Sequence, residues 1–347
     1  MLGLSLSKLL ATIIILAIGL HVPVGQHGEG NYLFTFAQIT DSHIGIHANS
    51  AVILKDTMNW LAHQRNVVFV VHTGDIVDHS RKLEEWKEAY RIMHTFDDVC
   101  NWTVLAGNHD VQESGGAPVN LTLYKQHFGE EAVNHFYMVD NRLLFILLSW
   151  TTRDGSIPSE TLDWMDQIIE DNSNLYVVVC LHPYLYPSGL LDIRWGMVPN
   201  AQEVWSHLDR HDNLILTLSG HLHHNWVRIH VHNQHKIWSI CTAALKDEGY
   251  VRLFDVYEDR IEVRGHSAWT KRDYLGLLDH FTIELTSNNY DVDGDLWPDS
   301  TDIKPTDALI PILPIVGVSL SILALTYLVQ RIIRKRSFHK VRKTRAP

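Results

Sequence analysis

The stretch "VVFVVHTGDIVD", residues 67–78, carries the strongest indication of the fold. Its first five residues are all Val or Phe, and such a continuous apolar run is typical of a strand buried on both faces. The run then gives way to Gly74 and Asp75, a turn residue followed by a carboxylate. A strand buried on both faces needs layers above and below it, so the stretch predicts a sheet packed inside an α/β protein.

Similar apolar runs recur along the chain, separated by amphipathic stretches. Strand, helix, strand, helix, strand over 33–110 predicts βαβ units, and a hairpin is expected around Asp140 and Asn141. Strands are predicted within 33–43, 67–78, 102–110, 135–141, 142–150, 175–184, 213–224, 226–232, 236–244, 250–259 and 260–266, and helices within 50–64, 82–96 and 159–171. This order indicates a sheet-rich α/β domain.

The ends of five predicted strands carry side chains that can bind metal ions. In chain order they are Asp41 and His43 as D-x-H, Asp75 after a glycine, Asn108 and His109 in G-N-H-D, His182 before a proline, and His221 and His223 in G-H-x-H. Oxygen and nitrogen ligands without a thiolate suit Mn, Fe or Zn. Because an α/β sheet places its active site at the carboxyl ends of its strands, ligands distant in sequence can converge there.

Each of these residues also has an ordinary structural interpretation. A strand-end aspartate such as Asp41 often caps the next helix, and a lone histidine such as His182 after an apolar run is commonly packed in the core. Five such motifs at five successive strand ends are harder to explain in this way. The pattern therefore favours a metal site.

The series D-x-H, G-D-x-x-D, G-N-H-D, histidine before proline, and G-H-x-H resembles the calcineurin-like metallophosphoesterase superfamily over roughly 33–225. The resemblance implies a four-layer α/β/β/α sandwich and a dinuclear metal site. It assigns Asp41, His43 and His223 to one metal, Asn108, His182 and His221 to the other, and Asp75 to both as a bridge. It also implies that His109 is a catalytic histidine that binds no metal, with Asp110 as its orienting neighbour.

The resemblance implies hydrolysis of phosphomonoesters or phosphodiesters. Two cations about 3.5 to 4 Å apart bind phosphoryl oxygens and lower the pKa of a water between them, so that the resulting hydroxide attacks in line. His109 would stabilise the phosphate or give a proton to the leaving oxygen. Two alternatives are a non-catalytic surface module that uses the metals structurally and a protein phosphatase. A binding module has no need of His109, which favours the enzyme.

Comparison with related families narrows the expected type of metal centre and the expected subfamily. Purple acid phosphatases are similar but carry a tyrosine ligand three residues after the bridging aspartate, where this chain has Asp78, so a tyrosinate-iron centre is not expected. Relatives of acid sphingomyelinase rely on disulfide-rich parts that Cys100, Cys180 and Cys241 cannot build. These cysteines are expected in the core, with one disulfide left open.

Two loops are candidates for substrate contact. The segment 183–199 follows His182 directly and contains Tyr184, Arg194 and Trp195, and the segment 149–156 contains Arg153. These side chains are either substrate contacts or simple packing and surface residues. In the segment 221–224, side chains alternate along an extended strand, which would place His221 and His223 on one side and His224 on the other.

The two ends of the chain indicate export and membrane attachment. The apolar segment 9–20 has the length of a signal-peptide core, although an uncleaved anchor is the alternative. The segment 308–329 has 22 uncharged residues, enough to cross a bilayer, and the basic tail behind it fits the positive-inside rule. A buried core helix is the alternative for this segment. We therefore expect a single-pass protein of the cell membrane, with the catalytic domain extracellular or lumenal and the tail cytoplasmic.

These signals divide the chain into five parts: a signal peptide or N-terminal anchor (1–30), the metallophosphoesterase domain (31–287), an acidic linker (288–307), a transmembrane helix (308–330) and a basic tail (331–347). Eight of the 29 basic residues and none of the 40 acidic ones lie in the tail, so residues 1–330 carry a formal charge of −19. Such a body is expected to repel nucleic acid.

The acidic linker has the spacing of an oxygen-ligand calcium loop. Its carboxylates alternate around a glycine and resemble the aspartate-rich repeats of thrombospondin type 3. The residues are Asp291, Asp293, Gly294, Asp295, Asp299 and Asp302. A calcium site here is one interpretation, and a solvated acidic stalk is the other.

Overall fold

A computed structural model of the protein describes residues 30–64, 66–187, 196–233 and 235–285. The predicted signal segment, calcium loop, transmembrane helix and basic tail lie outside these residues, as do Arg194 and Trp195. Within the described part of the chain, no helix combines the length and apolar character needed to cross a membrane.

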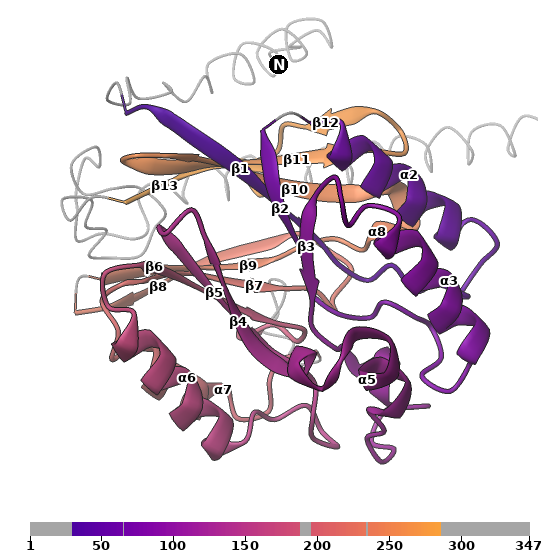
Figure 1. Ribbon diagram of the computed structural model, residues 1–347. Helices are drawn as coiled ribbons and strands as arrows, with labels where there is room; N and C mark the ends of the chain where they lie inside the picture. The colour runs from indigo at the N-terminus through magenta and orange to yellow at the C-terminus, as the bar shows by residue number, and fades with distance from the viewer. Residues whose placement is uncertain (1–29, 65, 188–195, 234, 286–347) are drawn as a thin grey trace, which may run out of the picture.

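Two β-sheets lie face to face in the middle of the molecule (Figure 1). The first runs in the order β12-β11-β10-β1-β2-β3, with β13 also paired to β11, and the second in the order β4-β5-β6-β7-β9-β8. The strands of the first are β1 (Tyr32–Ile39), β2 (Val67–His72), β3 (Asn101–Val104), β10 (Tyr250–Tyr257), β11 (Arg260–Ser267), β12 (Arg272–Tyr274) and β13 (His280–Glu284). Those of the second are β4 (Asn134–Val139), β5 (Leu143–Leu148), β6 (Tyr176–Leu181), β7 (Leu214–Ser219), β8 (Trp226–His232) and β9 (His235–Cys241).

Helices cover the outer face of each sheet, which gives the four layers that the family resemblance implies. On the side of the first sheet lie α2 (Ser50–Ala62), α3 (Leu83–His94) and α5 (Thr122–Phe128), and on the side of the second lie α6 (Ser159–Asp171) and α7 (Ala201–Leu208). The short elements are α4 (Asn108–Val111), η1 (Glu130–Ala132) and α8 (Leu245–Glu248).

Strand β2 is buried on both faces, as its apolar run predicts. Val70 packs among the helices on the outer side, while Phe69 and Val71 face the second sheet. Strand β5 repeats this pattern, because Phe145 faces the first sheet and Ile146 faces the helix layer formed by α6 and α7. Alternation of side chains along a strand thus supplies apolar contacts to two layers at once.

Most elements agree with their predicted positions, and the differences concern short segments. The hairpin turn at Asp140 and Asn141 has positive φ at both residues (53° and 47°), the geometry of a tight two-residue turn. Strands β12 and β13 were not individually predicted because they are short and partly polar. All three cysteines are buried and free, so the core prediction is confirmed and the disulfide is not formed.

A buried glutamine joins the two sheets beside the strand ends. Gln38 donates hydrogen bonds to Thr73 Oγ1 and to the carbonyl of Ser219, both at 3.0 Å, and accepts one from Thr242 at 2.7 Å. Strands β1, β2 and β3 run parallel in one sheet, and β5, β6 and β7 run parallel in the other. Gln38 therefore holds the carboxyl ends of β1, β2 and β7 close together.

Candidate metal centre

Six of the seven metal-ligating residues that the sequence predicts, all except Asn108, are brought together at these strand ends. Three groups each bring potential ligand atoms within 4.8 Å of one another. The groups are Asp41 with His43 and His223, Asp75 with His182 and His221, and His43 with Asp75 and His109. The first two match the two half-sites that the family resemblance implies, and each could hold a metal ion.

In the first half-site, Asp41 and two imidazoles form a compact cluster. Nε2 of His223 lies 3.2 Å from Oδ1 of Asp41 and 3.2 Å from Nε2 of His43. Asp41 is completely buried, and its other oxygen accepts hydrogen bonds from Thr40 Oγ1 at 2.7 Å and from the backbone N–H of His221 at 3.0 Å. One oxygen is thus fixed by the protein, and Oδ1 is directed at the cluster.

In the second half-site, Nε2 of His182 lies 3.1 Å from Oδ2 of Asp75 and 3.2 Å from Nδ1 of His221. Nε2 of His43 also lies 3.6 Å from the same oxygen of Asp75. Asp75 therefore stands between the two half-sites, which is the place of a bridging ligand. Asn108 begins α4, beside His109.

The chemistry of the donor set fits metal ions. Oδ1 of Asn108 is buried and has no hydrogen-bond partner among the described residues, and Oδ1 of Asp41 is buried beside the imidazoles of His223 and His43, at 3.2 and 3.6 Å. A buried polar atom without a partner is destabilising, and a cation would remove that penalty. The two oxygens belong to residues predicted as ligands of different metals.

The ligand loops have unusual backbone conformations. Five of the nine described non-glycine residues with positive φ are predicted ligands: Asp41, His43, Asp75, His221 and His223. Left-handed conformations are unfavourable for side chains with a Cβ and concentrate at functional sites. The expectation of an extended segment through His221 and His223 was therefore wrong, because β7 ends at Ser219 and both residues are left-handed (67° and 58°). They still reach the site, and His224 is exposed.

The outer nitrogens of two ligands lie beside acceptor oxygens that can orient the rings. Nδ1 of His182 donates to the carbonyl of Thr73 at 2.8 Å, and Nδ1 of His43 lies 3.3 Å from Oδ1 of Asp78. Such outer contacts fix the tautomer and aim the inner nitrogen at a metal. In the sequence, Asp78 marks a departure from the purple acid phosphatases. It is also the second aspartate of G-D-x-x-D, and this position is the signal that could have predicted its contact with His43.

His109 lies at the edge of the site and is partly accessible. Its ring packs edge-on against His43 at 4.6 Å between centroids, and its side chain is 41% exposed. Nδ1 donates to the backbone carbonyl of Asp78 at 2.9 Å. Burial lowers the pKa of His109, but Asp75 and the carbonyl and carboxylate of Asp78 raise it more, so the net shift is upward. The site therefore favours a protonated imidazole.

Asp110 does not orient His109 as predicted. Its carboxylate is completely buried and accepts three backbone hydrogen bonds, from Ile76 at 2.9 Å, Val77 at 3.0 Å and Gly107 at 2.8 Å. It thus braces the loops that carry Asp75 and Asn108. Burial raises the pKa of Asp110 to about 7, helped by the charge of Asp75.

The charges of the cluster are strongly coupled. Burial would raise the pKa values of Asp41 and Asp75, but the neighbouring imidazoles hold both well below their usual range. Burial lowers the pKa of His182, yet the charge of Asp75 raises it to about 9. Burial and the charge of His182 lower the pKa of His221 to about 4. A bound cation would take over the role that the protonated His182 has here.

The candidate substrate loops differ from expectation. Tyr184 is only 1% exposed, and its hydroxyl donates to the carbonyl of Ser239 at 3.2 Å, so it packs in the core and does not face a substrate. Arg153 is exposed, and its guanidinium donates to the carbonyl of Gly116. Trp150 lies in the same candidate segment, 149–156, and its ring lies 5.8 Å from that of His221.

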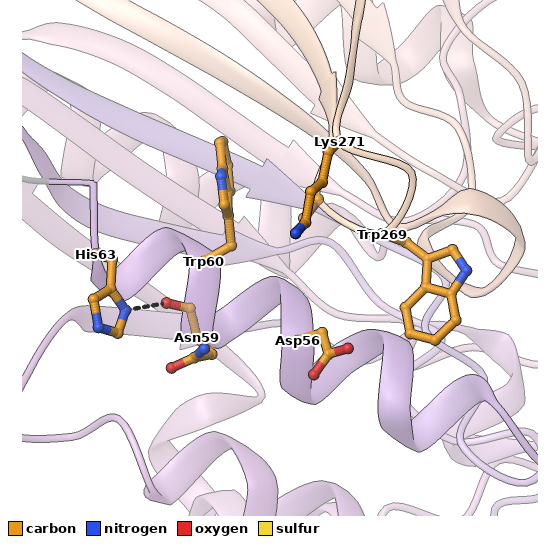
Figure 2. Close-up of a pocket in the computed structure, with 7 residues that line it drawn as sticks. Asp56, Asn59, Trp60, His63, Trp269 and Lys271 are labelled. Carbon is orange, nitrogen blue, oxygen red and sulfur yellow. Dashed lines mark hydrogen bonds between the residues drawn. The ribbon is translucent and has the colours of Figure 1, made fainter.

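A surface hollow of about 490 Å³ lies away from this centre (Figure 2). Its lining comes from α2, including Asp56 and Trp60, and from the segment after β11, including Trp269 and Lys271. None of the predicted site residues lines it. The candidate active site is therefore the ligand cluster and not this hollow.

Comparison with known proteins agrees with this geometry. The sequence profile of the family described as calcineurin-like phosphoesterase matches residues 34–269. The chain is 26% identical over 291 residues to the uncharacterized protein YvnB of Bacillus subtilis, covering 73% of this chain but only 22% of YvnB. It is 25% identical over 223 residues to the 3′,5′-cyclic-nucleotide phosphodiesterase alr5338 of Nostoc sp., covering 60% of this chain and 78% of that one.

Among solved structures, a dimetal phosphatase from Danio rerio has the same fold, with a TM-score of 0.59 at 16% identity. The match covers 74% of this chain and 100% of that one. The family profile spans more than half of the chain and includes every strand end that carries a predicted ligand. The chain therefore belongs to the calcineurin-like phosphoesterase family.

Proposed function

We propose that the centre hydrolyses phosphomonoesters or phosphodiesters with two bound metal ions, each Mn, Fe or Zn. The observation that carries the proposal is the convergence of two buried carboxylates and several imidazoles in two half-sites, together with a buried Oδ1 of Asn108 that has no hydrogen-bond donor among the described residues. One ion would be held by Asp41, His43 and His223, the other by Asn108, His182 and His221, with Asp75 between them. When bound, the two ions supply Lewis-acid activation of the ester and of the attacking water.

In this proposal, His109 contributes acid catalysis. Its Nδ1 is engaged by the carbonyl of Asp78, so Nε2 is the nitrogen that can present a proton to the ester. Asp78 lies against its Nδ1 and stabilises the protonated form, which can stabilise phosphoryl charge or donate to the leaving oxygen. A site that bound metals only for structure would not require a protonated, accessible imidazole beside Asp75. This supports catalysis over a binding module.

The test is an assay of the purified full-length chain with added Mn²⁺. The substrates are p-nitrophenyl phosphate, bis-p-nitrophenyl phosphate and 3′,5′-cyclic nucleotides, the last because of the name of the Nostoc relative. We expect hydrolysis of at least one ester that stops with a chelator and is lost in His182→Ala. Absence of turnover on every ester by a protein that binds two ions would favour the binding module instead.

We also propose that the domain over 31–287 acts outside the cytoplasm, tethered by a transmembrane helix at 308–330 with the basic tail inside. The apolar segments at both ends and the eight cations after 330 support this orientation. Protease added to intact cells should remove the domain and leave the tail protected. A full-length chain that alkaline wash releases from membranes would contradict the tether.

A further inference from the structure

His223 has an outer partner of the opposite kind from those of His43 and His182. Its Nδ1 lies 3.2 Å from Nζ of Lys246, whereas the corresponding nitrogens of His182 and His43 face a carbonyl and a carboxylate. Lys246 is only 8% exposed, and its backbone N–H donates to the carbonyl of Asp41 at 3.2 Å. The lysine is therefore fixed beside the first half-site.

This contact opposes metal binding through the inner nitrogen of His223. A histidine that ligates a metal through Nε2 carries its proton on Nδ1 and normally donates it to an acceptor. A lysine ammonium has three donors and no acceptor, so ligation would bring two donors face to face at this position. The ammonium also adds a positive charge next to an incoming cation, which is unfavourable at short range.

An alternative partner for the ammonium is present nearby. The carboxylate of Asp247 lies 3.7 Å from Nζ of Lys246 and is 58% exposed. Loading of the first half-site would then require Lys246 to leave His223 and turn toward Asp247. In the second half-site, His182 has no such requirement, because its Nδ1 already donates to a carbonyl.

We propose that Lys246 is a positioning residue that lowers the cation affinity of the half-site formed by Asp41, His43 and His223. The two ions consequently bind in sequence, with the half-site of Asn108, His182 and His221 filled first. The inference rests on the proposed dinuclear function and adds to it a control of metal occupancy. Only at higher cation concentration does the centre become complete.

Calorimetric titration of the metal-free full-length chain with Mn²⁺ tests this. The wild type should bind in two steps, and His223→Ala should remove the weaker one. Lys246→Gln, whose amide oxygen can accept the proton of Nδ1, should strengthen the weaker step on the order of tenfold and leave the stronger step unchanged. Lys246→Arg is the matched control, because it keeps a cationic donor and should keep the weak step weak.

The possible outcomes separate this inference from the proposed function. If the weaker step is unchanged or further weakened in Lys246→Gln, the inference is wrong but the proposed function stands. The same holds if His223→Ala loses the stronger step. A wild type that binds no Mn²⁺ overturns the metal centre and the inference together. Circular dichroism checks the fold of each variant. If Lys246→Gln does not fold, Lys246→Met, a second neutral replacement, is titrated in its place and decides the outcome.

Discussion

Oδ1 of Asp75 accepts a hydrogen bond from the backbone N–H of His109 at 2.8 Å. This bond ties the loop after β2 to the first turn of α4, so two of the loops that carry predicted ligands cannot move independently. The second oxygen of the same carboxylate is left directed at His182, 3.1 Å away. One side chain thus both fixes the loops and stands between the two half-sites.

Replacement of Asp75 by asparagine should separate these two tasks. The amide keeps the size of the side chain and can still accept from His109, but it removes the negative charge between the half-sites. We expect loss of at least one ion per chain and a fall in hydrolysis of at least roughly 100-fold. Elemental analysis and initial rates measure both effects, with Asp98→Asn on the exposed surface as the control. A variant that keeps two ions would contradict a bridging role.

Removal of the ions should lower thermal stability as well as activity. Two carboxylates and several imidazoles are crowded at the centre, and bound cations would neutralise the negative charge of the carboxylates and engage the unpaired oxygen of Asn108. Binding at a concentration 100 times the Kd adds about 2.7 kcal/mol per site to the free energy of unfolding. Calorimetric melts with chelator and with Mn²⁺ should therefore differ in Tm. The difference should shrink in His182→Ala, and equal shifts in both proteins would place the bound ions elsewhere.

His109→Asn should lower kcat by about 10² to 10⁴ while the metal content stays that of the wild type. The reason is that His109 is held by Asp78 through Nδ1, and in the proposed mechanism it contributes a proton and not a ligand. Rates at saturating substrate and metal analysis on the same sample measure the two quantities. His63→Asn, at the exposed residue that follows α2, is the control. Loss of an ion in His109→Asn would make this residue a ligand after all.

The positions of the ligands could be predicted from the sequence because each follows an apolar strand. The run before Asp75 and the runs before His182 and His221 show that these residues lie at strand ends, and parallel strands bring such ends together. Individual side-chain directions could not be predicted in the same way. The left-handed backbone at His221 and His223 and the three amides gathered by Asp110 depend on loops from different strands.

The contact of Lys246 with His223 could not be predicted from the sequence either. It lies in the four-residue helix α8, which no motif identifies, and it reaches His223 only because β10 pairs with β1 and brings that helix to the site. Local sequence patterns report strands and turns, whereas contacts between a ligand and a residue outside the motifs depend on the complete sheet order.

Asp110→Asn should act on stability and not chiefly on catalysis. The amide group would place its NH₂ or its single oxygen against three backbone donors, so at least one buried N–H of Ile76, Val77 or Gly107 loses its acceptor. We expect the free energy of unfolding to fall by about 1 to 3 kcal/mol. Denaturant titration measures the change, with the exposed Asp163→Asn as the control. If kcat instead fell as far as in His109→Asn with stability unchanged, Asp110 would orient His109 as the sequence alone predicts.

The three histidines at 221, 223 and 224 provide the last prediction. His223→Ala should release one ion, because Nε2 of His223 lies 3.2 Å from the buried Oδ1 of Asp41 and no other side chain replaces it in that group. His224→Ala should leave the metal content and kcat near the wild-type values, because His224 is exposed and belongs to none of the three ligand groups of the described residues. Metal analysis of the two variants side by side is decisive, since they remove the same side chain from adjacent positions. Equal loss of metal in both would mean that the loop after β7 rearranges on metal binding and that His224 can ligate in place of its neighbour.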